Sequence, residues 1–155
     1  MHSLVRVSAD DFDVGAECDA LRALSRRSGA IAQFVGVMRD SNQGDDVLTM
    51  ELEHYPGMTE RRISEIIERA AARWPILAAT VIHRVGLLHP QDQIVFVGVS
   101  AGHRHDAFQA CEFIMDFLKT EAPFWKKERT PSGERWVDAR DTDQQALARW
   151  QTEKA

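Results

Sequence analysis

Two apolar runs constrain the fold of this chain more than any other feature of its sequence. Residues 30–38 are almost uninterruptedly apolar and end at Arg39, and residues 93–100 carry valines at positions 95, 97 and 99. Strands that are buried on both faces of a sheet have sequences of this kind, whereas half-exposed strands alternate polar and apolar residues. The sequence therefore predicts a central, buried strand over each run.

Further helices and strands are expected around these two runs. Apolar residues at helical spacing predict helices over residues 14–21, 59–74, 106–122 and 142–153, with Thr59 capping the second and Asp106 the third. The remaining pattern predicts a half-exposed strand over 48–54, a strand over 79–85, and a hairpin of 124–129 and 134–138 around Pro131-Ser132-Gly133. Because helices and hairpin-paired strands are mixed, we expect an α+β fold.

The composition is that of one ordinary globular domain. With 155 residues, 44% of them hydrophobic and 28% charged, the chain is expected to form a single domain over residues 1–155. Its net charge of −5 opposes a nucleic-acid partner, because such binding rests on a basic face. Since the chain has no run of 18 apolar residues and no signal-peptide pattern, we expect a cytoplasmic protein without a membrane segment. Cys18 and Cys111 are expected to be buried thiols rather than parts of a disulfide or metal site.

A basic segment at residues 119–129 is the main candidate for a site. Four cations, Lys119, Lys126, Lys127 and Arg129, stand there against Glu121 and Glu128, which leaves an excess of two positive charges in an acidic protein. This local excess indicates an anionic ligand or partner tail. In an extended segment, Phe124, Lys126 and Glu128 would share one face and Trp125, Lys127 and Arg129 the other. A lysine crowded by cations or desolvated could act as a base or nucleophile, but a basic hairpin edge that prevents aggregation explains the pattern slightly better from the residues alone.

Two other positions are candidates for binding an anion. Gly102-His103-Arg104-His105 precedes the expected third helix, where free backbone amides and Arg104 could bind a phosphate, although a solvated loop is an equal alternative. Arg39 ends a buried strand beside a polar loop, which is a common location for sites. The common nucleophile, nucleotide and zinc motifs are missing, so an enzyme of this sequence would receive its reactive group from outside.

Several segments together resemble one known family, the large, catalytic subunit of molybdopterin synthase. The resemblance runs from about Gly29 to Trp150 and is carried by GAIAQFVGVMR, LEHYPGMTE, RWP, VIHRVG, IVFVGV, FIMDFLKTEAPFWKKE and GERWVDARD, in that order. Met38 departs from the family pattern, in which a smaller β-branched residue is expected. The first 28 residues carry no distinctive motif.

The resemblance implies a fold, a reaction and partners. The fold would be an α/β-hammerhead-like single domain with an added antiparallel β hairpin subdomain. The reaction would transfer sulfur from the thiocarboxylated C-terminal Gly-Gly tail of a small ubiquitin-like subunit to cyclic pyranopterin monophosphate, forming the dithiolene of molybdopterin. The assembly would be a homodimer of large subunits within a heterotetramer, and no resident cofactor is expected.

The resemblance also implies roles for individual residues. Lys119 and Lys126 would be catalytic, moving protons and stabilising charge during sulfur transfer. The substrate-binding residues would be Val37, Met38, Arg39, His103, Arg104, Lys119, Lys126, Lys127, Glu128 and Arg140, the last reaching in from a second copy of the chain. The alternative that remains is a noncatalytic anion-binding or scaffold module in which the same basic cluster only docks an acidic protein tail.

Overall fold

A four-stranded sheet forms the centre of the molecule. The computed structural model of the chain describes residues 1–137 and 141–152. The strand order of this sheet is β1-β6-β8-β2, in which only β1 and β6 run parallel. The strands are β1 (His2–Ser8), β2 (Ala30–Val37), β6 (Ile76–Arg84) and β8 (Gln93–Ala101). The second apolar run is therefore a central strand, as the sequence predicts.

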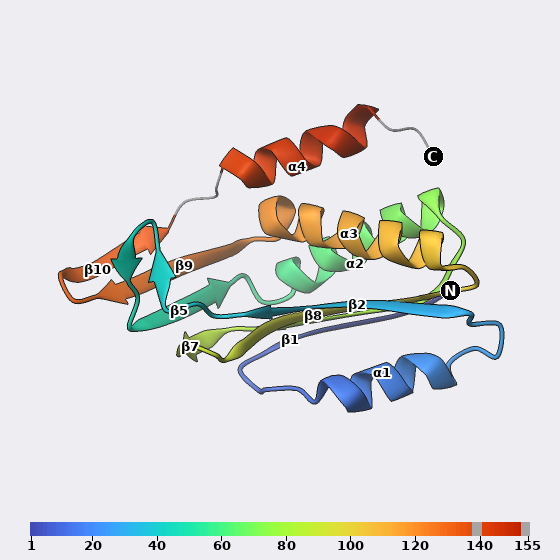
Figure 1. Ribbon diagram of the computed structural model, residues 1–155, viewed down its shortest axis with the longest axis horizontal. Helices are drawn as coiled ribbons and strands as arrows, with labels where there is room; N and C mark the ends of the chain where they lie inside the picture. Colours follow the sequence, from blue (N-terminus) through green and yellow to red (C-terminus); the bar gives the residue numbers. More distant parts are fainter. Residues whose placement is uncertain (138–140, 153–155) are drawn as a thin grey trace.

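A second, antiparallel sheet extends from one end of the first (Figure 1). Its strand order is β10-β9-β5-β7, and a small hairpin of β3 and β4 accompanies it. The strands are β3 (Ser41–Asn42), β4 (Asp45–Asp46), β5 (Thr49–His54), β7 (Gly86–Leu88), β9 (Phe124–Thr130) and β10 (Gly133–Val137). The predicted hairpin subdomain and the α+β class are thereby confirmed.

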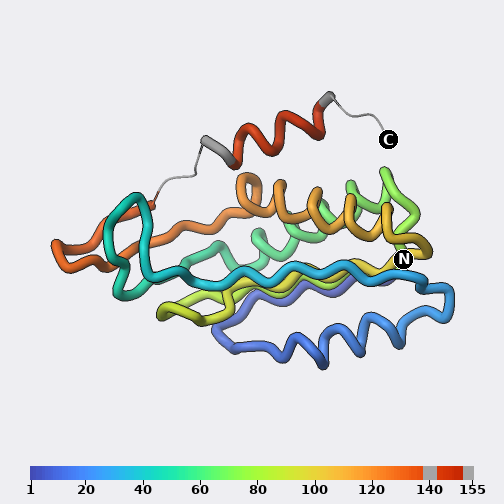
Figure 2. The backbone as a smooth tube through the Cα atoms, viewed as in Figure 1, coloured from blue at the N-terminus to red at the C-terminus, as the bar shows by residue number. Residues whose placement is uncertain are grey.

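Helices cover both faces of the main sheet. The helices are α1 (Val14–Ala23), α2 (Met58–Arg73), α3 (Arg104–Glu121) and α4 (Asp141–Thr152). The backbone trace shows α2 and α3 on one face, α1 on the other, and α4 outside α3 (Figure 2). Among the described residues, no helix is both long enough and apolar enough to cross a membrane.

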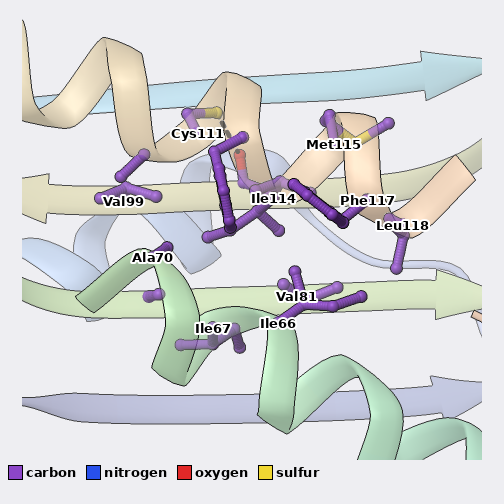
Figure 3. Close-up of a cluster of buried hydrophobic side chains, with 14 of the residues drawn as sticks. Ile66, Ile67, Ala70, Val81, Val99, Cys111, Ile114, Met115, Phe117 and Leu118 are labelled. Carbon is purple, nitrogen blue, oxygen red and sulfur yellow. Dashed lines mark hydrogen bonds between the residues drawn. The ribbon is translucent and has the colours of Figure 1, made fainter. Parts of the chain in front are cut away.

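The larger core lies between the main sheet and the α2–α3 layer. Side chains on one stripe of each helix meet the inward-facing residues of β6 and β8, including Val81 and Val99 (Figure 3). On the opposite face, Leu21 of α1 packs so closely on β8 that a Cβ built at Gly98 would lie 2.5 Å from its Cδ1. A side chain at position 98 would therefore force the Leu21 and Phe96 side chains to shift within this core.

The sequence prediction for residues 30–38 was right about the strand but wrong about its place in the sheet. The run was expected to be central and buried on both faces, but β2 is an edge strand that pairs only with β8 in the described structure. Phe34 is 40% exposed and Val37 is 49% exposed. An apolar run shows that side chains favour burial, but it does not show whether another strand of the same chain lies beside it.

Three further local expectations were wrong or incomplete. Strand β1 was not predicted. Helix α3 is not capped by Asp106, because His103 is its N-cap residue and Asp106 lies in the first turn. Helix α2 begins at Met58, and Gly57, at a φ of 86°, takes the cap position that was assigned to Thr59. The Glu60 carboxylate accepts a hydrogen bond from Gly57 N there at 3.2 Å.

Candidate active site

The two predicted catalytic lysines come together where α3 ends and β9 begins. Lys119 lies in the last turn of α3, and Ala122 is extended at φ −74° and ψ 131°. Pro123 follows and cannot continue the helix, so the chain turns and enters β9 at Phe124. Lys126 thus comes back beside Lys119, and both side chains line the same two adjoining cavities.

The first cavity lies between the end of β2, the loop that follows it, and the hairpin subdomain. It has a volume of about 210 Å³. Six of the predicted substrate-binding residues line it, and three of these, Val37, Met38 and Arg39, come from the end of β2 and the residues after it. The backbone of Met38 is fixed there, because its N–H donates to Asp92 O and its carbonyl accepts from Gln91 N, both at 2.9 Å. The other described lining residues are Ser41, Asn42, Gln43, Val47, Met50, Ile94, Lys119, Phe124, Lys126, Glu128, Val137 and Asp143.

The second cavity is more apolar and lies against the end of α3. Its volume is about 240 Å³, and it shares Val37, Ile94, Lys119, Phe124 and Lys126 with the first. The other described lining residues are Phe34, Val35, Gly36, His83, Val95, Met115, Leu118 and Ala122. A charged group that enters this cavity leaves much of its water behind, so its interaction with a lysine is stronger than at the open surface.

His83 is a member of this site that was not among the residues predicted from the sequence. Its ring is buried and stacks on Phe124 with 3.8 Å between ring centroids. Burial, with smaller contributions from the positive charges of Lys126 and Lys119, lowers the pKa of His83 to about 3. A polar residue two positions after the buried Val81, and so on the same face of β6, was the available signal.

Glu128 forms part of the wall of the first cavity and is held by two side chains. It is 6% exposed, and its carboxylate accepts hydrogen bonds from Asn42 Nδ2 and from Arg135 Nε, each at 3.2 Å. Arg135 also donates to Asp45 Oδ2 at 2.8 Å. These bonds join the hairpin subdomain to the loop over residues 40–46.

Lys127 lies on the opposite face of the second sheet from the cavities. Its Nζ is 2.9 Å from Glu134 Oε2 and 5.6 Å from the centre of the Trp136 ring. The hydrogen bond to Glu134 raises the pKa of Lys127. The predicted alternation of β9 is therefore confirmed, and it separates Lys127 from Lys126, although both belong to the predicted substrate-binding set.

His103 and Arg104 are also distant from the lysine pair within one chain. Both are exposed at the N-terminal end of α3. Fifteen positions separate Arg104 from Lys119, which is roughly 22 Å along a helix. Arg140 lies outside the described residues. In the part of the chain that the structure describes, no group of three or more His, Cys, Asp or Glu side chains is placed to hold a metal ion.

Fold and site together define an α+β protein in which two lysines on different elements face adjoining cavities suited to an anionic ligand. The chain belongs to the MoaE protein family, whose model matches residues 7–121. The family resemblance seen in the sequence is thereby confirmed.

Similar proteins support the same assignment in sequence and in structure. A molybdopterin synthase catalytic subunit from Ralstonia nicotianae is 61% identical over 94% of this chain and 83% of its own length. The solved structure of a molybdopterin biosynthesis MoaE protein from Burkholderia ambifaria is 58% identical, with a TM-score of 0.84 over 97% of this chain and 99% of that one. Molybdopterin synthase from Staphylococcus aureus, at 27% identity, has a TM-score of 0.79 over 86% of this chain and 96% of that one. The expectation of a sulfurtransferase subunit is confirmed at the level of the family.

Proposed function

We propose that this chain is the catalytic subunit of a molybdopterin synthase. It transfers sulfur from the thiocarboxylated Gly-Gly tail of a small ubiquitin-like subunit to cyclic pyranopterin monophosphate. The observation that carries this proposal is the convergence of Lys119 and Lys126, from α3 and β9, on two cavities that share a wall. Two adjoining cavities allow a protein tail and a small phosphorylated ligand to meet at one pair of cations.

The lysines supply charge and protons, while the sulfur arrives on the partner. During transfer, the bond between sulfur and the acyl carbon of the tail breaks, and a bond between sulfur and a pterin carbon forms while the oxygen substituent of that carbon leaves. Negative charge develops as the acyl carbon is attacked, and a nearby ammonium group stabilises it. The acyl group then passes to water, either directly or through the amine of Lys119. No cysteine of this chain is needed, and Cys111 supports this, because burial raises its thiol pKa to about 12.

The remaining predicted residues divide between one chain and a second copy. Arg39, with Val37 and Met38, would hold the phosphate and pterin in the first cavity, and Glu128 would keep its wall in place. His103 and Arg104 are too far from Lys119 to join the same site in one chain. We therefore propose that they, with Arg140, act across a homodimer of large subunits inside a heterotetramer.

Two general properties belong to the same proposal. Residues 1–155 would act as a single domain. The protein would work in the cytoplasm, where thiols stay reduced, and its two cysteines, Cys18 and Cys111, are both free.

The deciding experiment is reconstitution of the enzyme with thiocarboxylated small subunit and substrate. Lys119→Ala and Lys126→Ala should each lower kcat by at least ~100-fold, while gel filtration still shows the complex. Arg129→Ala removes an exposed cation from the other face of the same strand and is the matched control, with turnover close to that of the unmodified chain. Lys127→Ala should have a much smaller effect than Lys126→Ala, and an equal loss would place Lys127 in the site.

The scaffold alternative gives a different result in this experiment. If the basic cluster only docks an acidic tail, each lysine variant would lose complex formation and turnover in the same proportion. Normal turnover by both single lysine variants would remove the proposed roles of Lys119 and Lys126.

A further inference from the structure

Among the described residues that line the second cavity, side-chain hydrogen-bond donors outnumber acceptors. Among the described residues that line it, the only side chains with a nitrogen or oxygen atom are those of Lys119, Lys126 and His83. A protonated lysine donates and cannot accept. His83 is therefore the one described side chain in this lining whose nitrogen can accept a hydrogen bond.

The position of the His83 ring shows which of its nitrogens is the acceptor. Nδ1 lies 2.8 Å from the carbonyl oxygen of Arg84, and a carbonyl only accepts, so Nδ1 carries the hydrogen. The ring is neutral, because it is buried and faces positive charge from Lys119 and Lys126, with His54 also nearby. In this tautomer Nε2 has a free lone pair. The stack on Phe124 fixes the plane of the ring.

Lys119 is the natural donor for this acceptor. Its side chain is exposed and makes no hydrogen bond or ion pair with any residue that the structure describes. It lines the same cavity as His83. A flexible lysine with three donors and a fixed acceptor in one partly dry cavity form a favourable pair, because hydrogen bonds to charged groups are among the stronger ones.

We propose that His83 is a positioning residue for the reaction: the flexible Lys119 side chain, which makes no hydrogen bond with a described residue in this structure, rotates to donate one to His83 Nε2, and this bond directs the ammonium group into the second cavity. The consequence for turnover rests on the proposed function, whereas the hydrogen bond itself does not. The stack on Phe124 and the bond to Arg84 hold the acceptor in place before any ligand enters. His83 would thus orient the charge that Lys119 supplies, without taking its proton.

Two substitutions of His83 separate the effect of its hydrogen-bond acceptor from the effect of its aromatic ring. His83→Phe keeps an aromatic ring to stack on Phe124 but has no acceptor, and His83→Gln keeps an acceptor but has no ring. Thermal unfolding of both variants shows whether each is folded. The pKa of Lys119 is then read on the chain alone, by NMR titration of isotopically labelled lysine side chains, with Lys119→Arg assigning the signal.

The acceptor stabilises the charged form of Lys119, so its loss should lower the lysine pKa. We expect a decrease of about one unit in His83→Phe and little change in His83→Gln. In the assembled enzyme, kcat should fall about tenfold in His83→Phe with KM nearly unchanged, and His83→Gln should recover most of it.

Other results would overturn the proposal. An unchanged Lys119 pKa in His83→Phe, or a change confined to Lys126, would show that His83 does not receive the Lys119 hydrogen bond. The opposite order of variants, with His83→Phe active and His83→Gln inactive, would show that only packing on Phe124 matters. Absence of turnover in the unmodified enzyme would count against the proposed function, while the lysine titration would still decide the role of His83.

Discussion

Glu128 on β9 and Arg135 on β10 face each other across the hairpin, with 3.2 Å between Glu128 Oε1 and Arg135 Nε. Asn42, in the short strand β3 that follows β2, donates to the same carboxylate. A buried carboxylate requires such partners, because an unpaired charge in a poorly hydrated place is costly. The pair therefore links the hairpin to the loop that forms the opposite wall of the first cavity.

Replacing Glu128 by Gln should weaken this link. The neutral amide loses charge-assisted bonds to both partners, so we expect the free energy of unfolding to fall by about 1–3 kcal/mol and the KM for the pterin substrate to rise. Urea unfolding and steady-state kinetics measure the two effects. Glu134→Gln, on the exposed face of the same hairpin, is the control. Equal losses of unfolding free energy in the two variants would mean that the hydrogen bonds of the buried Glu128 stabilise the fold no more than the exposed Lys127–Glu134 pair.

The position of His103 and Arg104 predicts a site shared between two copies of the chain. If Arg104 of one copy serves Lys119 of the other, then Lys119→Ala and Arg104→Ala are each inactive but complementary. Mixed dimers restore one complete site, so random pairing in a twofold dimer should give about a quarter of the unmodified activity. Subunits are mixed under mild dissociating conditions and then assayed. Activity no higher than that of the separate variants would exclude a shared site of this kind.

Much of the fold was predictable from local patterns. Helical periodicity identified the amphipathic helices, and the valines of residues 93–100 identified the central strand β8. The edge position of β2 was not predictable, because the exposure of Phe34 and Val37 depends on the absence of a neighbouring strand in the described structure, not on their own chemistry. Strand β1 was missed because its short segment has no strong pattern, and its pairing partner β6 lies far along the chain.

The candidate site was predictable only in part for a related reason. Lys119 and Lys126 are close in sequence and separated by a proline, so local reasoning brings them together. His83 reaches them only through the packing of β6 against α3 and β9. The partners of Glu128 are likewise non-local, since Asn42 is 86 positions away. Spacing along the sequence carries no direct information on such contacts.

The buried His83 should make the protein sensitive to acid. Its folded-state pKa of about 3 lies below the ordinary value of 6.5, so the unfolded chain binds the proton more readily. The stabilising contribution is complete above pH 6.5 and is lost as the pH falls from 6.5 towards 3. The loss is on the order of 4 kcal/mol over that range. Urea unfolding at a series of pH values should show a shallower decline in His83→Phe, and an identical slope in both proteins would contradict the assignment.

Trp150 should anchor α4 to the rest of the molecule. It is 2% exposed, its Nε1 donates to Asp116 Oδ2 at 2.6 Å, and its carbonyl accepts from Arg73 Nη1 at 3.1 Å. Its ring also packs edge-on against Trp74 and Phe113. Helix α4 in turn places Asp143 in the wall of the first cavity. Loss of this anchor should therefore affect both stability and substrate binding.

Trp150→Ala is expected to lower the free energy of unfolding by about 3–5 kcal/mol, because it removes a large buried side chain. Hydrogen exchange should show faster exchange in α4 and smaller changes in α3, and KM should rise more than kcat falls. Trp150→Phe keeps a smaller aromatic ring in place and loses the bond to Asp116, so its cost should be lower, about 1–2 kcal/mol. If the alanine variant were no less stable than the phenylalanine variant, the packed ring would not be what holds α4.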